Sequence, residues 1–414
     1  MAMTDTIEVH AAPSRPSLTV LYRLTPWWVK VLVIFAASRV VTTVIMLIFA
    51  AIQSANPWTL AHPDYFSFAG IWDGAWYHIV SVSGYPKTLP LIDGHINQNT
   101  WAFLPAYPFL VGGLVAVTTL PFTVVGVFVS VGFAAGAALV FYKILLLKLG
   151  SNTAMFSVVL FCVAPLSPIF QVDYAESMQL FFLACALYFL QQRRYWAMLP
   201  FVAIASFTRP GMLAFALAMG LHVIYRWVVR RREPFRAGEQ IAAVSATIAS
   251  ALLGYAWPAI AGWVTGVPDA YTATELSWRA PYVGWAPLIP FEPWIAGANW
   301  WIARAGIPGT LVPGLLLVAA IILFGALLFT PAVKRLGVDL RFWVASYVLY
   351  LLAVFFPQSS VFRIFVPAFP LLGAIAQPRS RLYRVIVVLL FIAGQVAWVY
   401  MTWWFSDADD FTPP

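Results

Sequence analysis

Charged residues are scarce in this chain: Asp, Glu, Lys and Arg make up 10% of its 414 residues, whereas 62% are hydrophobic. Soluble domains carry about 25% charged residues, so this composition excludes an ordinary water-soluble protein. Apolar runs long enough to cross about 30 Å of hydrocarbon recur along the whole chain. Inside a membrane the backbone polar groups must be paired within the protein, so these runs predict helices.

Metal-ligand patterns are also missing. Only two cysteines occur, Cys162 and Cys185, each inside an apolar run without metal-type spacing, and we expect both to be packing residues. No His-x-x-x-His or paired-acid spacing is present. Three acids near the C-terminus, Asp407, Asp409 and Asp410, form a tail that we expect to be solvated. The sequence therefore predicts no metal and no other cofactor.

The N-terminal residues 1–25 lack the short apolar core and small-residue cleavage site of a signal peptide, so the first apolar run is expected to be an uncleaved anchor. The net charge of +8 does not gather in one stripe. Lys and Arg fall in short clusters between apolar runs, which is the pattern of membrane topology signals rather than of nucleic-acid binding. We therefore predict contact with membrane lipids and no nucleic-acid partner.

The hydropathy pattern predicts an all-α polytopic membrane protein with about eleven transmembrane helices, ten to thirteen being possible. Residues 1–29 are expected to form a tail, residues 30–404 a single transmembrane domain, and residues 405–414 a second tail. The expected spans lie near residues 30–52, 122–147, 153–171, 176–190, 196–208, 212–229, 240–264, 311–329, 341–356, 362–376 and 383–404.

The segment 102–118 is apolar enough to cross the membrane, but Pro105 and Pro108 lie near its start. If it does not cross, most of the 24 Lys and Arg residues fall on the N-terminal side. The positive-inside rule then places the N-terminus in the cytoplasm and the two longer loops, 53–121 and 265–310, outside. We therefore expect 102–118 to be re-entrant or interfacial. Loops of this length often carry function, although they can also merely cap the bundle.

No Asp or Glu falls at mid-depth in any expected span. Ion-coupled transporters usually place a carboxylate or a broken helix near the bilayer midplane. Here the acids outside the cytoplasmic clusters gather near one surface. This placement favours an enzyme whose substrate has its head group at the interface and its tail in lipid.

The most informative string is WDGAWYH at residues 72–78, followed by Gly84-Tyr85 and by FLPAYP at residues 103–108. It resembles the WD-x-x-WY…GY…F-x-P-x-YP pattern of bacterial mannosyltransferases related to phosphatidylinositol-glycan class V (PIG-V-like), in the GT-C superfamily of lipid-linked-sugar transferases. Downstream, DYAES at 173–177 stands where that family has YTES. Thr208-Arg209-Pro210 resembles its next turn, and Arg363 followed by PAFP at 367–370 resembles its last segment.

This resemblance covers nearly the whole chain, although DYAES departs from YTES and Phe362-Arg363-Ile364 replaces the family's Arg-Tyr pair. It implies a GT-C-like bundle and an inverting glycosyltransferase. The implied donor is a polyprenyl-phosphate sugar, most simply mannose, and the implied acceptor is a glycolipid or cell-envelope glycan outside a bacterial cell membrane. Two other classes stay open: a lipid or solute transporter, and a non-catalytic scaffold for envelope assembly.

Inverting transfer needs one base for the acceptor proton, because the phosphate leaves as a stable anion. Asp73 is the first candidate, since Trp72 and Trp76 flank it in the sequence and can stack on sugar faces. The alternative is that Asp73 caps an interfacial helix that begins at Gly74, with the rings as an aromatic belt. Asp64 and Asp173 are the competing bases.

The leaving phosphate needs cations, and few are expected on the outer side. Arg363 is the first candidate, because a guanidinium can hold two phosphate oxygens at once. Arg209, Arg279 and His95 come next, and Arg209 can instead bond backbone carbonyls beside Pro210. The full set of candidate substrate-binding residues is Trp72, Trp76, Tyr77, His95, Asp173, Glu176, Arg209, Arg279 and Arg363.

Overall fold

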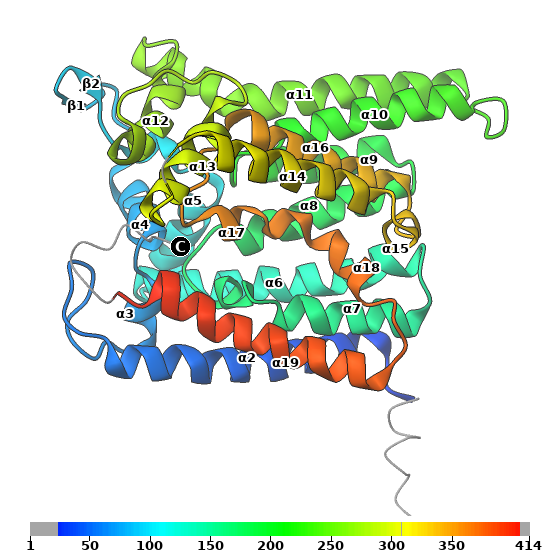
Figure 1. Ribbon diagram of the computed structural model, residues 1–414, viewed down its shortest axis with the longest axis horizontal. Helices are drawn as coiled ribbons and strands as arrows, with labels where there is room; N and C mark the ends of the chain where they lie inside the picture. The colour runs from blue at the N-terminus through cyan, green and yellow to red at the C-terminus, as the bar shows by residue number, and fades with distance from the viewer. Residues whose placement is uncertain (1–23, 308, 406–414) are drawn as a thin grey trace, which may run out of the picture.

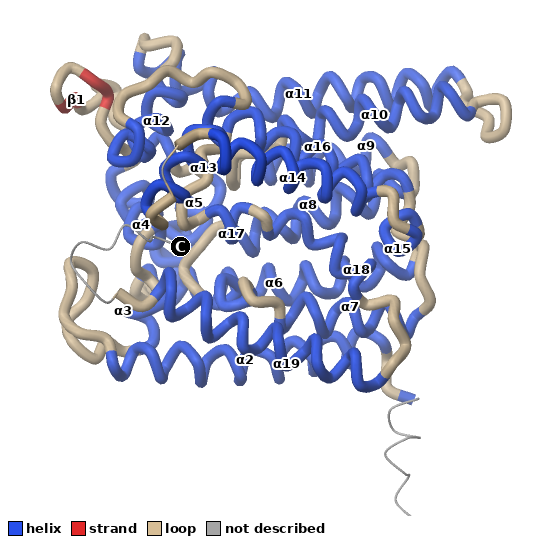
Figure 2. Tube along the Cα trace, in the orientation of Figure 1, coloured by secondary structure: helices blue, strands red, loops and turns tan. Residues whose placement is uncertain are grey.

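The computed structural model describes residues 24–307 and 309–405 of the chain. The predicted tail acids Asp407, Asp409 and Asp410, and most of both expected tails, lie outside the described residues. Helices run side by side in one bundle (Figure 1). Figure 2 shows that strands make up very little of the described structure: the only described strands, β1 (Leu91–Ile92) and β2 (His95–Ile96), form one short hairpin. The predicted all-α polytopic class is confirmed.

Each expected span coincides with a helix or with consecutive helical pieces. Five of the described helical segments are individually long and apolar enough to cross a membrane. The bundle consists of α2 (Trp27–Ile52), α6 (Phe122–Leu146), α7 (Ser151–Val163) with η2 (Ser167–Gln171), α8 (Glu176–Gln191), α9 (Tyr195–Ser206), α10 (Leu213–Val229), α11 (Ala237–Thr265), α14 (Leu311–Leu328), α15 (Pro331–Lys334), α16 (Val338–Val354), α17 (Val361–Ile364) with η3 (Val366–Leu371) and α18 (Leu372–Ile375), and α19 (Arg381–Trp398) with η4 (Val399–Trp403).

Two of the expected spans are broken rather than continuous. The break between α7 and η2 contains Pro165, and Pro367 and Pro370 interrupt the α17–α18 stretch, because proline lacks the N–H that a helix needs. Broken helices are tolerated at membrane depth only where other groups satisfy the freed backbone. At the first break, Arg39 of α2 does this: it donates to the carbonyls of Cys162 at 2.6 Å and Ser167 at 2.7 Å.

Residues 53–121 begin and end at the same end of the bundle. The Trp27 ring at the start of α2 stacks on Tyr142 near the end of α6, with ring centroids 5.3 Å apart. At the other end, Phe66 in α3 (Tyr65–Ala69) lies 6.3 Å from Phe128 near the start of α6. The helix α5 (Ala106–Thr118) has 13 residues, about 20 Å at 1.5 Å per residue, and does not carry the chain across.

The two long connections form one cap at this end of the bundle, called here the loop end. The first contains α3, α4 (Asp73–Ser83), the hairpin, η1 (Thr100–Ala102) and α5; the second contains α12 (Ala270–Val283) and α13 (Glu292–Arg304). Asn99 donates to the hydroxyl of Thr274 at 2.8 Å, and Trp76 meets Trp278 edge to face at 5.3 Å. These contacts join segments that lie far apart in the sequence.

Small residues let the helices approach closely in the centre of the bundle. Ala134, Ala137 and Ala138 of α6 are buried, and a side chain at Gly136 would begin 2.8 Å from the ring of Phe181 on α8. Membrane helices commonly pack through such small residues, because lipid gives no hydrophobic drive to association. The close pairing of α6 and α8 fixes the position of the first turn of α8 at the loop end.

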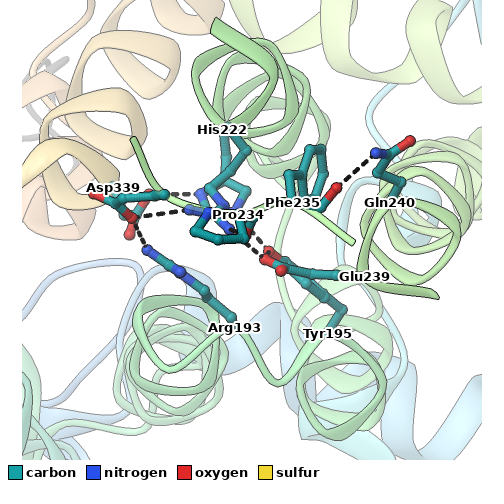
Figure 3. Close-up of polar contacts among 10 residues, drawn as sticks. Arg193, Tyr195, His222, Pro234, Phe235, Glu239, Gln240 and Asp339 are labelled. Atoms are coloured by element: carbon teal, nitrogen blue, oxygen red, sulfur yellow. Dashed lines mark hydrogen bonds and ion pairs between the residues drawn. The ribbon is translucent and has the colours of Figure 1, made fainter. Parts of the chain in front are cut away.

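The opposite end of the bundle holds a buried polar network (Figure 3). His222 on α10 lies between Asp339, with Nδ1 at 2.7 Å from the carboxylate, and Tyr195, with Nε2 at 2.9 Å from the hydroxyl. Arg226, one turn further along α10, pairs with Glu239 of α11 at 2.9 Å. These contacts tie α9, α10, α11 and α16 together far from the loop end.

Candidate active site

Asp73 occupies the first position of α4, and its side chain does not cap that helix. The residue before it, Trp72, has φ 59° and makes no side-chain cap bond. Asp64, by contrast, caps α3: its carboxylate accepts from the backbone N–H of Phe66 at 2.8 Å and of Ser67 at 3.0 Å. The bonds from Ser67 lower the pKa of Asp64. Asp64 is therefore a capping residue, whereas the Asp73 carboxylate is free to face other elements.

Asp73 belongs to a cluster of two acids and two arginines, called here the charge cluster. Arg363 Nη1 donates to Asp73 Oδ2 at 2.5 Å and lies 3.2 Å from Glu176 Oε1. Arg209 Nη1 lies 2.9 Å from Glu176 Oε1 and 3.7 Å from Asp73 Oδ2. The four side chains come from α4, the start of α8, the turn after α9, and α17. The first turn of α8 thus supplies the acid that both arginines share.

The charge cluster is formally neutral and largely buried. The side chains of Glu176, Arg363 and Arg209 are 5%, 7% and 12% exposed, and that of Asp73 is the most exposed at 22%. Burial alone would lower the pKa of Arg209, but the nearby charge of Glu176 and other neighbours raises it by more. The pKa of Arg209 therefore lies above its ordinary value, and the guanidinium stays charged. Removing one partner of such a set leaves an uncompensated buried charge, at a cost of about 3–5 kcal/mol.

Two tyrosines orient the arginines. Arg209 donates to the hydroxyl of Tyr77 at 3.1 Å, one turn after Asp73 on α4. The Tyr174 ring lies under the Arg363 guanidinium, 5.1 Å from centroid to carbon, and its hydroxyl accepts from the backbone N–H of Asp73 at 3.2 Å. A guanidinium held by both a ring face and a carboxylate keeps a fixed direction.

Asp173 lies next to the charge cluster but faces away from it, toward α5 and α6. It is fully buried, and its Oδ1 accepts from the hydroxyl of Tyr107 at 2.8 Å. A side chain at Gly126 would begin 1.8 Å from that oxygen, and one at Gly74 would begin 3.3 Å from the Asp173 carbonyl. Burial raises the pKa of Asp173 well above its ordinary value. Asp173 therefore joins α4, α5 and α6 and is not placed to bind substrate or accept its proton.

A cavity of about 330 Å³ adjoins the charge cluster, within the size range of small-ligand sites. Glu176, Arg209 and Arg363 line it; Asp73 does not, and reaches it only through its two arginine partners. The remaining wall comes from α10, α11, α12 and α16, including Trp257, Tyr271, Glu275, Trp278, Arg279, Tyr347 and Tyr350.

The structure brings together only part of the predicted site. Asp73, Tyr77, Glu176, Arg209 and Arg363 meet, as described above. Arg279 lines the same cavity, but its Nη2 donates to the carbonyls of Ala286 at 2.5 Å and Pro287 at 2.8 Å, so it holds the second loop.

Three other predicted residues lie elsewhere. Trp72 packs against Trp58 and Phe405, and Trp76 stacks on Phe103 at 5.5 Å, so neither ring lines the cavity. Trp72 precedes α4 with φ 59°, and the ring of Trp76 is held between Phe103 and Trp278 of the loop end. His95 is exposed on the hairpin and stacks on Trp285 of the second loop at 4.7 Å, outside the cavity wall.

Sequence reasoning missed Glu275, which lines the cavity from α12. It is the one acid in that helix, and it lies four residues after Tyr271 and three before Trp278. That spacing places all three on one face of a helix. A lone acid flanked by aromatic residues on one face was the signal available in the sequence.

An apolar groove of about 480 Å³ lies on the other side of α17. Phe362 and Phe365 of α17 line this groove, while Arg363 between them joins the charge cluster. The other walls come from η2, η3 and α19, with Phe161, Pro165, Leu166, Phe170, Phe369, Trp398 and Met401 among the lining residues. One short helix thus separates the cavity with the charged lining residues from an apolar groove.

No protein-family model matches this chain, and no curated protein matches it. Among solved structures, the chain is similar to an oligosaccharyltransferase from Archaeoglobus fulgidus tethered with an acceptor peptide, at 12% identity and TM-score 0.39, covering 88% of this chain and 54% of that one. It is also similar to the oligosaccharyltransferase AglB from Archaeoglobus fulgidus in complex with an inhibitory peptide and a dolichol-phosphate, at 11% identity and TM-score 0.43, covering 91% and 56%. This chain spans a little over half the length of those structures. Superpositions this loose carry no argument about its chemistry.

Proposed function

We propose that this protein is an inverting glycosyltransferase that moves a sugar from a polyprenyl-phosphate donor to a hydroxyl group of a glycolipid or cell-envelope glycan. One observation carries the proposal: Arg363 of the charge cluster lines a cavity, and Phe362 and Phe365 beside it on α17 line an apolar groove. A lipid-linked sugar fits these three environments: its tail fits the groove, its phosphate fits the charge cluster, and its sugar fits the cavity. Mannose as the sugar rests on the motif resemblance.

Arg209 and Arg363 bind the donor phosphate in this proposal. Both line the cavity and both are held by tyrosines, so their guanidinium groups are oriented before the donor arrives. Charge-assisted bonds from guanidinium to phosphate are among the strongest hydrogen bonds in proteins. A polyprenyl chain attached to that phosphate can follow Phe362 and Phe365 into the apolar groove.

Asp73 takes the acceptor proton. Before the donor binds, its carboxylate is paired with Arg363 and does not line the cavity. When the donor phosphate draws Arg363 toward itself, the Asp73 carboxylate is released from that pair and can reach the acceptor hydroxyl. Donor binding thereby gives the base access to the acceptor.

The proposed transfer forms one bond, breaks one bond and moves one proton, and none of these changes requires a cofactor. The acceptor oxygen forms a bond to the anomeric carbon while the bond from that carbon to the phosphate oxygen breaks. The phosphate leaves with the electron pair, stabilised by Arg209 and Arg363, and the acceptor proton moves to Asp73. Attack opposite the leaving group inverts the anomeric configuration.

The loop end faces the outside of the membrane in this proposal. The connection between α10 and α11 and the α15 turn lie at the opposite end (Figure 1). These connections hold Arg230, Arg231, Arg232, Arg236, Lys334 and Arg335, and basic clusters of this kind stay in the cytoplasm. Labelling of a cysteine introduced at Ser83, on α4, from outside intact cells tests this; labelling only after lysis would reverse the orientation.

The decisive test is transfer of radiolabelled sugar from polyprenyl-phosphate mannose to a lipid extract by the purified protein. We expect transfer by wild type and a loss of about 10²- to 10⁴-fold in kcat for Asp73→Asn, because the amide cannot take a proton. Asp93→Asn is the matched control, since Asp93 is exposed in the hairpin turn with φ 49°, which Asn tolerates. Full activity of Asp73→Asn would remove the base assignment. No transfer by wild type from mannose, glucose or arabinose donors would remove the function.

A further inference from the structure

We propose that Glu275 is an acceptor-recognition residue, whose carboxyl group binds a hydroxyl of a neutral sugar at the wall that α12 contributes to the cavity. This inference rests on the proposed glycosyl transfer but concerns a separate residue on the second loop. The two assignments can therefore fail independently.

Glu275 shares the cavity with the charge cluster without belonging to it. Its helix, α12, contributes Tyr271, Glu275, Trp278 and Arg279 to the cavity wall. Within residues 24–307 and 309–405, no Lys or Arg side chain forms an ion pair with Glu275, unlike Asp73 and Glu176. Its hydrogen-bond partner is Tyr271, one turn earlier on the same helix.

Holding the Glu275 carboxyl group in this cavity costs folding free energy. Burial raises the pKa of Glu275 to about 7, and the Tyr271 bond and the charge of Arg209 only partly oppose this shift. Transferring a polar group from water without full compensation destabilises the fold. A group kept in a cavity against such a cost is a candidate for function.

The chemistry of the surrounding wall fits a sugar and does not fit an ion. Aromatic side chains share the cavity wall with Glu275: Trp257, Tyr271, Trp278, Tyr347 and Tyr350 line the same cavity. Rings stack on the apolar faces of sugars, while a carboxyl group can accept a hydrogen bond from a hydroxyl. An anionic ligand would be repelled by ionised Glu275 at this wall, and it is better served by Arg209 and Arg363.

The cavity lining therefore offers two kinds of group. The arginines of the charge cluster, called here the donor pole, suit a phosphate, and Glu275 with the aromatic residues of the lining, called here the acceptor pole, suits a sugar. Glu275, Arg209 and Arg363 line one and the same cavity. An acceptor hydroxyl held by Glu275 can thus present a neighbouring hydroxyl to the donor pole.

The first experiment measures steady-state kinetics of Glu275→Gln against both substrates. We expect the KM for the acceptor extract to rise at least about 10-fold, the KM for polyprenyl-phosphate mannose to change less than about 2-fold, and kcat to change less than about 3-fold, because one charge-assisted hydrogen bond is lost. Asp269→Asn is the matched control, since Asp269 is exposed at the start of α12 and makes no cap bond. An unchanged acceptor KM, or a raised donor KM, overturns the proposal.

The second experiment does not depend on transfer. Saturation-transfer difference NMR of methyl α-mannoside and methyl α-glucoside with the full-length protein should give signals for wild type, Asp269→Asn and Asp73→Asn, and lose them for Glu275→Gln. Persistence of these signals in Glu275→Gln overturns the sugar site. Signals that depend on Glu275 in a protein without transferase activity would keep the site and remove the proposed function.

A purely structural role is separated by Tyr271→Phe, which removes the hydrogen-bond partner and leaves the carboxyl group. We expect Tyr271→Phe to keep the sugar signals, because Glu275 is still present. If Tyr271→Phe and Glu275→Gln lose the signals together and lower the melting temperature equally, Glu275 acts by holding α12, and the proposal is wrong.

Discussion

Arg363 and Asp73 are 290 positions apart in the sequence, and Arg363 Nη1 donates to Asp73 Oδ2 at 2.5 Å. This pair joins the first long connection to the broken helical stretch near the C-terminal end of the chain. Glu176 lies 3.2 Å from the same guanidinium nitrogen, so one arginine serves two acids. A negative group entering the cavity would compete with both carboxylates for Arg363, which lines the cavity.

Replacing Arg363 by Lys tests the role of the guanidinium. A single ammonium group cannot bind two acids and a phosphate in fixed directions. We expect kcat/KM for the polyprenyl-phosphate donor to fall roughly 10- to 100-fold, which corresponds to losing one hydrogen bond between charged groups. Arg304→Lys, at the exposed end of α13, is the control. Equal kinetics for Arg363→Lys and wild type would exclude Arg363 from phosphate binding.

A double-mutant cycle tests whether Arg363 and Asp73 stabilise each other. Arg363→Met leaves Asp73 without its closest cation, and we expect a loss of about 3–5 kcal/mol in unfolding free energy. The double variant Arg363→Met with Asp73→Asn should recover part of that loss. Denaturation in detergent, followed by tryptophan fluorescence, measures the four proteins. Strict additivity of the two single effects would show that the pair is not coupled.

The sequence predicted the bundle well because hydrophobic length is a local property. It also pointed to Asp73, Arg209 and Arg363, since charges outside the basic clusters are few and each follows or precedes an apolar run. Which of the predicted residues line the cavity depends instead on contacts between segments far apart in the chain, which the sequence does not show. Trp72 and Trp76 lie close to Asp73 in sequence, yet aromatic residues of other segments hold their rings outside the cavity.

Asp173 and Glu275 also show that the sequence alone does not identify the cavity residues: Asp173 was predicted to bind substrate and does not line the cavity, whereas Glu275 was not predicted and does. Both are acids expected near the loop end with aromatic residues close by in the sequence, and that pattern alone does not decide which of the two lines a cavity. Packing of α5 and α6 encloses Asp173, whereas packing of the second loop onto α10, α11 and α16 leaves Glu275 at a cavity wall. These are properties of tertiary contacts between helices far apart in the chain.

Stability should depend on pH through Glu275. Because burial raises the pKa of Glu275 from its ordinary 4.5 to about 7, the folded state binds the proton more tightly than the unfolded state. This contribution is present below pH 4.5 and is lost as pH rises through about 7. We expect the melting temperature of wild type to fall more between pH 5 and pH 8 than that of Glu275→Gln. Parallel curves for the two proteins would contradict the shifted pKa.

Gly126→Ala should damage the loop end, because the added Cβ would lie 1.8 Å from Asp173 Oδ1. Overpacking of this kind costs about 1–3 kcal/mol. The Asp173 bond to Tyr107 would also have to shift, and α4 with it. Gly132→Ala on the same helix is the matched control, since nothing lies within 4 Å of its added Cβ. We expect a lower melting temperature and reduced transfer only for Gly126→Ala; equal behaviour would show that α6 can move away from Asp173.

The network at the opposite end of the bundle should support the fold without touching the chemistry. His222→Ala removes the group between Asp339 and Tyr195 (Figure 3) and leaves the buried Tyr195 hydroxyl and the partly buried Asp339 carboxylate without that partner. Each such group costs about 1–3 kcal/mol, so we expect a clearly lower melting temperature. Both KM values should stay at wild-type levels below that temperature, because the cavity lies at the loop end. A raised KM for either substrate, measured where the variant is fully folded, would instead reveal coupling through α10 and α16 between the two ends.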